Sequence, residues 1–320
     1  MRFASVKTVE QDCNYNALPF RMFSHPLDIN FTEFVETTKP RRRNFEPINV
    51  YPYSYLQPVA NICKSTKGIF LLFMIKSAPG NFDQRQVIRK TWTNQVYFEE
   101  DTIRHVFLLA RSMNKTINHH LSLEKLVYGD IVEMTYVDDY YNNTYKTMGG
   151  INWCVRYCSK SKFVMLVDDD FYVATDYLLN YLHGLPQNKS RSLFAGHVST
   201  QDRPQRCRFQ KWYISISDYP FTRYPPFINA GAIIMSMDFV KRLQIAMQYT
   251  KVFKFDDVFL AIVAYKLNVK PINIKEINLD PVYFQGKMFN TLLASHGYGD
   301  PIRLWKAWYR HLFPDMKKFQ

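Results

Sequence analysis

Three consecutive aspartates, Asp168 to Asp170, follow the apolar run FVMLV and precede the apolar run FYV. Three neighbouring carboxylates repel one another, so we expect a positive partner beside them. Hard carboxylate oxygens at a strand end suit Mg²⁺ or Mn²⁺, which usually bridge a protein carboxylate and substrate phosphates. An acidic surface turn is the alternative interpretation, but the apolar runs on both sides favour the metal.

A second acidic pair, Asp256 and Asp257, opens a stretch with helical spacing, DDVFLAIVAYKLNV. The helix dipole favours acidic residues in the first turn, so capping alone would explain both. A metal-held diphosphate beside a separate carboxylate base describes sugar transfer from a nucleotide sugar, and also some nucleases and phosphohydrolases. Successive helical residues point about 100° apart, so only one of the two carboxylates can readily face a substrate hydroxyl.

The elements that must position these residues alternate between strands and helices. The expected strands are apolar throughout, which favours an α/β fold with a mainly parallel, Rossmann-like sheet and helices on both faces. In such sheets ligands bind at the carboxyl ends of the strands, where the three aspartates lie. Strands are predicted at 69–75, 105–110, 130–137 and 163–167, and helices at 82–92, before Gly129, and at 142–160.

The rest of the chain is less regular. Residues 1–66 contain six prolines and little periodicity, which predicts an irregular stem before a single catalytic domain at 67–320. We interpret Trp92 and Trp153 as core aromatics. In the second half, strands are predicted at 193–198 and 209–216, a turn and strand at 224–236, and helices at 237–249, 256–269 and 301–313.

The composition is that of a globular protein with a basic excess. Lys and Arg number 41 against 28 Asp and Glu, which gives +13 and favours phosphorylated or anionic partners, although a solvated basic surface explains it equally. We find no signature of nucleic-acid binding. The longest apolar run, IFLLFMI, is shorter than the ~20 residues that span a bilayer, so the chain is soluble as written or lacks an N-terminal anchor.

Cysteines and glycosylation sequons bear on the compartment. The five cysteines are widely spaced, and Cys154 and Cys158 share a helix face without a second pair or histidines that would complete a zinc site. The sequons fit a protein of the secretory pathway, although each is a common chance match. They lie at Asn30, Asn114, Asn142 and Asn188.

Eight motifs follow one another in order along the chain. They are RQVIRKTW at 85–92, FLLA at 107–110, DDYYNNTYKT at 138–147, Trp153-x4-Cys158, DDDFYV at 168–173, KWYIS at 211–215, YPPFINAGAIIMS at 224–236 and DDVFLA at 256–261. This series resembles the β1,3-galactosyltransferase and β1,3-N-acetylglucosaminyltransferase family, glycosyltransferase family 31. Any one motif is weak evidence, but eight in register over residues 67–310 are strong.

Three positions depart from the family pattern. Asp256 stands where the family usually has Glu, Leu166 stands where a lysine is often found, and the glycine-rich turn is reduced to Gly231 between two alanines. None of these changes removes an expected catalytic carboxylate. We therefore expect an active enzyme.

The resemblance implies a GT-A fold with nucleotide binding in the first half and acceptor binding in the second. The implied reaction is inverting transfer of galactose or N-acetylhexosamine from a UDP-sugar to the 3-hydroxyl of an acceptor glycan on protein or lipid. Asp257 would be the catalytic base, with Asp256 orienting the acceptor or capping the helix. Asp170 and His296 would bind Mn²⁺, with Mg²⁺ as the alternative ion. Donor binding is assigned to Arg85, Arg89, Lys146, Asp168 and Asp169.

For Arg89, a helix-surface salt bridge is the competing interpretation, and for His296 a structural role. Members of the family are usually Golgi membrane proteins with a lumenal catalytic domain, so membrane association would require an anchor outside this sequence. The rival functional hypotheses are a catalytically inactive carbohydrate-binding or chaperone-like protein of the same fold and, more remotely, a metal-dependent nuclease.

Overall fold

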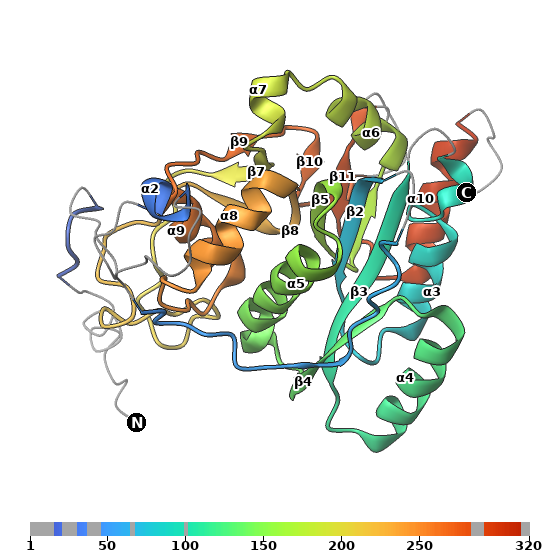
Figure 1. The fold of residues 1–320 in the computed structure, drawn as a ribbon, viewed down its shortest axis with the longest axis horizontal. Helices are drawn as coiled ribbons and strands as arrows, with labels where there is room; N and C mark the ends of the chain where they lie inside the picture. The colour runs from blue at the N-terminus through green and yellow to red at the C-terminus, as the bar shows by residue number, and fades with distance from the viewer. Residues whose placement is uncertain are drawn as a thin grey trace, which may run out of the picture.

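The computed structural model describes residues 16–20, 31–36, 46–64, 68–98, 102–282 and 291–314. In this part of the chain, a central sheet lies between two layers of helices (Figure 1). Its strand order is β1-β4-β3-β2-β5-β8-β7-β9. The strands are β1 (Tyr55–Gln57), β2 (Ile69–Lys76), β3 (Ile103–Arg111), β4 (Ile131–Val137), β5 (Ser161–Asp168), β7 (Phe194–Ser199), β8 (Phe227–Ser236) and β9 (Ile272–Asn273).

The middle of the sheet is parallel, whereas at the edges β1 runs antiparallel to β4 and β9 runs parallel to β7. Strand β2 pairs in parallel with β3 and β5, and β3 pairs in parallel with β4. Strand β8 then runs antiparallel to both β5 and β7. The predicted α/β class is confirmed, and the parallel arrangement is concentrated in the strands that the sequence marks by continuous apolar runs.

Two hydrophobic cores lie on opposite faces of this sheet. Along β2, Leu72 and Met74 belong to one core, whereas Leu71, Phe73 and Ile75 belong to the other. The alternation follows from the two-residue period of a strand. The first core is covered by α2 (Phe31–Glu36), α5 (Asn143–Tyr157), α8 (Met237–Met247) and α9 (Asp256–Lys266). The second is covered by α3 (Phe82–Lys90), α4 (Lys115–Tyr128), α6 (Thr175–His183) and α10 (Pro301–Leu312).

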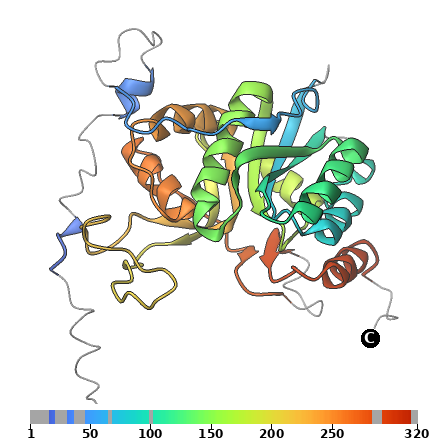
Figure 2. The same cartoon turned by 90° about the horizontal axis from the view of Figure 1, so that it is seen from below.

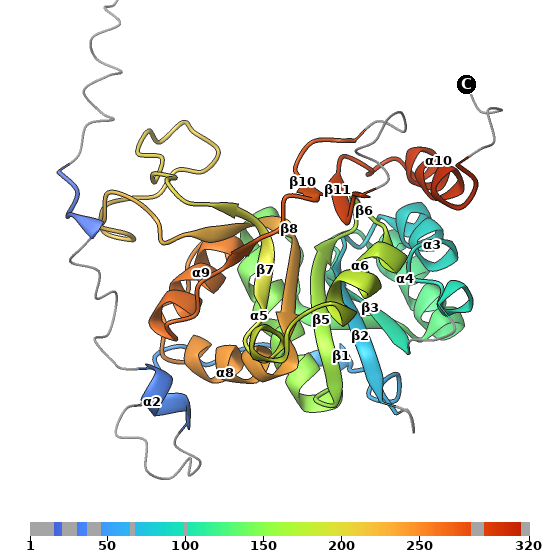
Figure 3. The same cartoon turned by 90° about the horizontal axis from the view of Figure 1, so that it is seen from above.

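A small second sheet extends from the end of β5. It has the order β10-β11-β6 and combines β6 (Phe171–Val173) with β10 (Ile277–Asn278) and β11 (Ala294–His296). In the antiparallel pair of β6 and β11, His296 lies opposite Phe171. The amide of Tyr298 also donates to the carbonyl of Asp170 at 2.8 Å. Figure 3 shows this sheet beside α10 at one end of the central sheet.

The strand predicted at 209–216 is wrong. The structure has turns there, with one isolated bridge between Gln205 and Tyr213. The guanidinium of Arg206 donates to four backbone carbonyls around this loop, so these acceptors are bonded without a neighbouring strand. The four acceptors are Ile214, Ser215, Tyr219 and Phe221, at 2.7–3.0 Å.

Parts of the predicted stem pack against the body of the protein (Figure 2). Helix α2 contacts α8, and β1 forms the edge of the sheet next to β4. A disulfide joins Cys63 to Cys158 in the part of the chain that is described. Both Trp92 and Trp153 are fully buried, as predicted, and the indole of Trp153 donates to the carbonyl of Pro58. Among the described helices, none is long and apolar enough to cross a membrane.

Candidate active site

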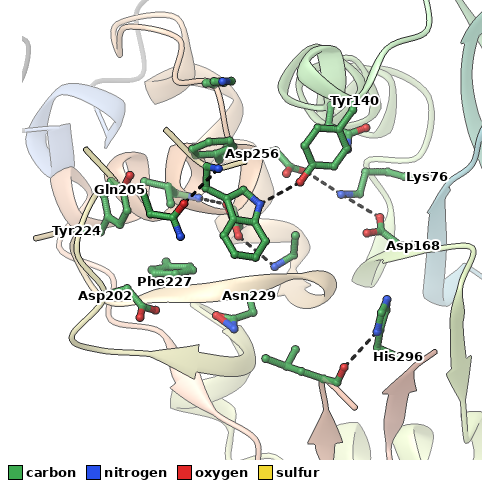
Figure 4. A pocket seen from close by; sticks show the side chains of 18 of the residues that line it. Lys76, Tyr140, Asp168, Asp202, Gln205, Tyr224, Phe227, Asn229, Asp256 and His296 are labelled. Atoms are coloured by element: carbon green, nitrogen blue, oxygen red, sulfur yellow. Dashed lines mark hydrogen bonds and ion pairs between the residues drawn. The ribbon is translucent and has the colours of Figure 1, made fainter. Parts of the chain in front are cut away.

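A cavity of about 560 Å³ opens where β2 and β5 end and α9 begins. Lys76 is the last residue of β2, Asp168 is the last of β5, and Asp256 is the first of α9, and all three line the cavity (Figure 4). The predicted position of the site at the carboxyl ends of parallel strands therefore agrees with the structure. The other lining residues used below are Tyr140, Asn143, Gln205, Trp212, Asn229, Lys254, Asp257 and His296.

Lys76 is a positive partner of the aspartates. Its ammonium lies 2.9 Å from Asp168 Oδ1 and 2.7 Å from Asp256 Oδ2, and the lysine is only 5% exposed. The hydroxyl of Thr147 also donates to Asp256 Oδ2, at 2.7 Å. Burial disfavours the charged form of Asp256, but the attraction and hydrogen bond of Lys76, together with Thr147, hold its pKa below the usual range. Asp256 is therefore a buried, fully paired carboxylate that joins α9 to β2 and α5.

Asp257 is held differently, although it is the next residue. The backbone amide of Ala230 donates to its Oδ2 at 3.3 Å, and the amide of Val258 donates to its Oδ1 at 2.7 Å. Burial first, and the charge of Asp256 second, raise the pKa of Asp257 to about 7. A cavity-lining carboxyl group with a pKa near neutrality can accept a proton from a substrate hydroxyl under physiological conditions.

The backbone that donates to Asp257 depends on Gly231. This residue has a φ of 114°, and a Cβ placed on it would lie 2.2 Å from the ring of Phe171. A side chain here would be strained and would displace the aromatic ring that follows the three aspartates. The one glycine that remains in the shortened turn therefore stands where the close approach of β8 to β6 requires it.

The three consecutive aspartates have three different environments. Asp168 is paired with Lys76, and Asp169 is buried and accepts from the side-chain amide of Asn81 at 2.9 Å. Asp170 Oδ2 lies 3.0 Å from His296 Nε2, and both side chains are partly exposed, at 40% and 46%. Burial raises the pKa of Asp168 and Asp169. The pair of Asp170 and His296 that the resemblance implied is thus in contact.

The surroundings of His296 fit a metal ligand. Its Nδ1 lies 3.1 Å from the carbonyl oxygen of Leu279, which can only accept, so the ring proton is assigned to Nδ1. Nε2 lies 3.0 Å from Asp170 Oδ2, and because a carboxylate oxygen also only accepts, these two atoms need a shared cation, which can be a proton or a metal ion. Asp170 Oδ1 is buried and has no hydrogen-bond partner in the described part of the chain.

Asp170 and His296 suit Mn²⁺ or Mg²⁺ both in the chemical type of their side chains and in the number of protein ligands that they supply. Within the described residues, no group of three or more His, Cys, Asp or Glu side chains could hold a metal ion. Such ions are commonly held by one or two protein groups, with substrate phosphates and water as the remaining ligands. Asp170 and His296 would hold the ion, and the donor would complete its coordination.

Arg85 and Arg89 lie outside this cavity, in a cluster of buried ion pairs. Arg85 is fully buried, binds Glu124 at 2.7 Å and donates to the hydroxyl of Ser77 at 3.0 Å. Arg89 pairs with Glu124 and with Asp130, both at 2.7 Å. For Arg89 these contacts agree with the salt-bridge alternative. Direct donor binding by either arginine stays a prediction.

Lys146 supports the same loop as Arg85. Its ammonium donates to the carbonyl of Ser77 at 2.9 Å and lies 2.7 Å from Asp138 Oδ1. Ser77 directly follows β2, so Arg85 and Lys146 hold the loop beside the cavity from two sides. Their contacts in this structure are positioning contacts.

The sequence interpretation missed several cavity residues. Lys76 could have been found, since three carboxylates need a cation and a lysine ends the first apolar strand. Asn229 carries a buried side-chain oxygen without a hydrogen-bond partner in the described residues, and Figure 4 shows it pointing toward the cavity. Neither Tyr140 nor Trp212 was singled out as a binding residue, because aromatic residues are common throughout this sequence.

Comparison with known proteins identifies related sequences. The profile of the Galactosyltransferase family matches residues 83–275. The Drosophila melanogaster protein beta-1,3-galactosyltransferase brn is 37% identical over 240 residues, which cover 74% of this chain and 73% of that protein. Lactosylceramide 1,3-N-acetyl-beta-D-glucosaminyltransferase A of Danio rerio is 30% identical over 272 residues, which cover 80% of this chain and 70% of that protein. Human beta-1,3-galactosyltransferase 5 is 30% identical over 240 residues, which cover 73% of this chain and 76% of that protein.

Solved structures give more distant similarities. The galactosyltransferase LgtC in complex with donor and acceptor sugar analogues superposes with a TM-score of 0.42 at 12% sequence identity. The matched region covers 74% of this chain and 95% of that one.

Proposed function

Because the chain belongs to the galactosyltransferase family and is a glycosyltransferase of GT-A type, we propose that it catalyses an inverting, metal-dependent β1,3 transfer. The donor is a UDP-sugar carrying galactose or an N-acetylhexosamine, and the acceptor is the 3-hydroxyl of a glycan on protein or lipid. The names of the relatives support this linkage, since each carries a β1,3 or 1,3-β transferase designation.

The observation that carries the proposal is the state of Asp257. Two backbone amides orient its carboxylate at the cavity, and burial raises its pKa to about 7. In the proposed step, Asp257 takes the proton of the acceptor hydroxyl as the oxygen attacks the anomeric carbon. The bond from that carbon to the diphosphate oxygen breaks, and UDP leaves with the electron pair. Attack from the face opposite the leaving group inverts the anomeric configuration.

The other wall of the cavity would receive the donor. Asp170 and His296 would hold Mn²⁺, which neutralises charge on the departing diphosphate. Asp168, fixed by Lys76, and Asp169, fixed by Asn81, lie directly before the metal-binding aspartate in the chain. They are proposed to contact the ribose or metal-bound water.

The test is a donor screen by UDP release, with UDP-galactose, UDP-N-acetylglucosamine, UDP-N-acetylgalactosamine and UDP-glucose, each with β-galactoside and N-acetylglucosaminide acceptors and Mn²⁺. One of the first three donors should give acceptor-dependent release, and product analysis should show a β1,3 bond. EDTA should abolish release, and Mn²⁺ should restore it better than Ca²⁺. Donor binding without any release would support the inactive alternative, and full activity in EDTA would contradict the metal.

We further propose a lumenal location in the Golgi apparatus. The disulfide between Cys63 and Cys158 supports an oxidising compartment. Asn188 is exposed in the short helix α7 (Gln187–Ser190) and is the best candidate for glycosylation. Asn114 caps α4, and the Asn142 amide donates to the carbonyl of Val137, so these two sequons have structural roles.

Expression behind a signal sequence should give a glycosidase-sensitive mass shift that Asn188→Gln removes. No shift at any sequon would contradict passage through the secretory pathway.

A further inference from the structure

We propose that Trp212 and Tyr140 form a platform for a second sugar of the acceptor, next to the sugar whose hydroxyl reacts. The inference rests on the proposed transferase function and adds that the preferred acceptor contains at least two sugars. Trp212 and Tyr140 line the same cavity as Asp256 and Asp257. The two aromatic side chains are far more exposed than Asp256: Trp212 is 50% exposed and Tyr140 is 49% exposed, whereas Asp256 is 5% exposed. The aromatic pair therefore lies at the mouth, and the carboxylates lie deeper.

The two rings are joined to each other. The indole Nε1 of Trp212 donates to the hydroxyl of Tyr140 at 3.3 Å, a contact marked by a dashed line at Tyr140 in Figure 4. The ammonium of Lys211 lies over both rings, 4.8 Å from the Tyr140 centroid and 5.5 Å from that of Trp212. Two adjacent, exposed aromatic side chains at the edge of a cavity provide the kind of surface on which a ligand can stack.

The loop that carries Trp212 is already held in place. The side chain of Gln205 accepts from the backbone amide of Trp212 at 3.3 Å, and Arg206 bonds four carbonyls farther along the loop. Cys207 is disulfide-bonded. A binding surface that is ordered before the ligand arrives does not spend binding energy on ordering it.

The platform lies on the same side of the cavity as the proposed base. Tyr140 begins the short helix η4 (Tyr140–Asn142), which leads directly into α5, where Thr147 bonds Asp256. The ammonium of Lys254, two residues before Asp256, lies 4.0 Å from the centroid of Tyr141. In Figure 4 Tyr140 and His296 lie on opposite sides of the cavity. An acceptor that presents its hydroxyl to Asp257 would extend toward these rings, away from the metal pair.

The chemistry of the platform fits a pyranose. A sugar ring has an apolar face of C–H groups and an edge of hydroxyls, so it matches an aromatic face surrounded by a few polar side chains. Gln205, Asn143 and Lys254 also line the cavity and supply such groups. A single sugar at Asp257 would leave the platform unused, whereas a disaccharide would cover it.

The experiment compares a monosaccharide acceptor with a β-linked disaccharide that carries the same reactive sugar. Wild-type enzyme should show a KM for the disaccharide that is lower by ~10-fold, the effect of about 1.4 kcal/mol of stacking. Trp212→Ala should remove this advantage and leave the monosaccharide KM, the donor KM and acceptor-independent UDP release near wild type. Trp212→Phe should restore most of the disaccharide advantage, and Tyr140→Ala should reduce that advantage as well.

Phe209→Ala is the matched control, because Phe209 is 74% exposed in the same loop and does not line the cavity. Equal losses for both acceptors in Trp212→Ala would overturn the platform, as would a raised donor KM. If wild-type protein transfers no sugar, the proposed function fails, and disaccharide binding by calorimetry decides the inference alone. Binding that weakens in Trp212→Ala and not in Phe209→Ala would uphold it, and no difference would refute it.

Discussion

The two walls of the cavity carry carboxylates in opposite conditions. On the α9 wall, Asp256 is 5% exposed, pairs with Lys76 and accepts a hydrogen bond from Thr147, and Asp257 accepts from two backbone amides. On the side of β6 and β11, His296 lines the cavity and is 46% exposed, and Asp170, which contacts His296, is 40% exposed. One oxygen of Asp170 lacks a partner among the described residues. The carboxylates of the first wall are therefore paired within the protein, and that wall is complete, whereas the second wall is incomplete.

This difference separates two kinds of expected effect. Changing a group on the complete wall should alter the chemical step, because its geometry is already set by the protein. Changing a group on the incomplete wall should alter how much metal or donor is needed. Turnover and metal dependence are therefore the two measurements that distinguish the walls.

The largest expected effect is that of Asp257→Asn. Asparagine keeps the size of the side chain but cannot take the proton, so kcat should fall by ~10² to 10⁴. UDP-sugar affinity, measured by calorimetry, should remain near wild type. Asp256→Asn is the matched control at the adjacent position, and it should retain more activity. If Asp257→Asn turned over normally and Asp256→Asn did not, the assignment of the two acids would be reversed.

An intermediate effect is expected on the other wall, from Asp170→Ala. Loss of this carboxylate should raise the Mn²⁺ concentration for half-maximal activity by at least ~10-fold, since even residues that only orient metal ligands cost 10- to 100-fold. Asp169→Ala should shift the Mn²⁺ midpoint less than Asp170→Ala does, because the Asp169 side chain accepts from Asn81 and would reach the ion only through water. Equal shifts of the Mn²⁺ midpoint in the two variants would contradict the different roles assigned to Asp170 and Asp169.

The smallest effect is a displacement of the pH profile. Asp257 must be ionised to accept a proton and has a pKa of about 7, so log(kcat/KM) should fall with a slope of about one per pH unit below that value. Asp256→Asn removes one of the two causes of the raised pKa, so the midpoint should move to lower pH. Burial remains as the larger cause, and the midpoint should stay above the ordinary 3.8. An unchanged midpoint in the variant would assign the titration to another group.

The sequence predicts the first half of the fold better than the second. Strands such as β2 and β5 are buried on both faces and read as continuous apolar runs. Helix α4 ends at Gly129, as predicted, because its φ of 62° suits glycine. The small sheet of β6, β10 and β11 has strands of two or three residues, which is too short for any periodic signal.

The site residues, too, could be predicted only in part from the sequence. The acidic residues stand out because carboxylates are unusual at the end of an apolar strand. The resemblance implies donor binding for Arg85 and Arg89, but it does not reveal their buried ion pairs, because Glu124 lies 39 positions after Arg85 in the chain. The type of a residue thus indicates what its side chain can bind, and only the fold determines which partner lies within reach.

The pairing of β6 with β11 also has a consequence for how the protein matures. His296 follows Asp170 by 126 positions, and the pairing of β6 with β11 brings the two side chains together. Contacts between such distant segments form late, and a chain is synthesised from its N-terminus. A nascent chain that has not yet reached β11 therefore displays its aspartates without their histidine. Binding of the proposed ion would accordingly require that synthesis has passed β11, so metal uptake would report that this late segment has been made and has paired with β6.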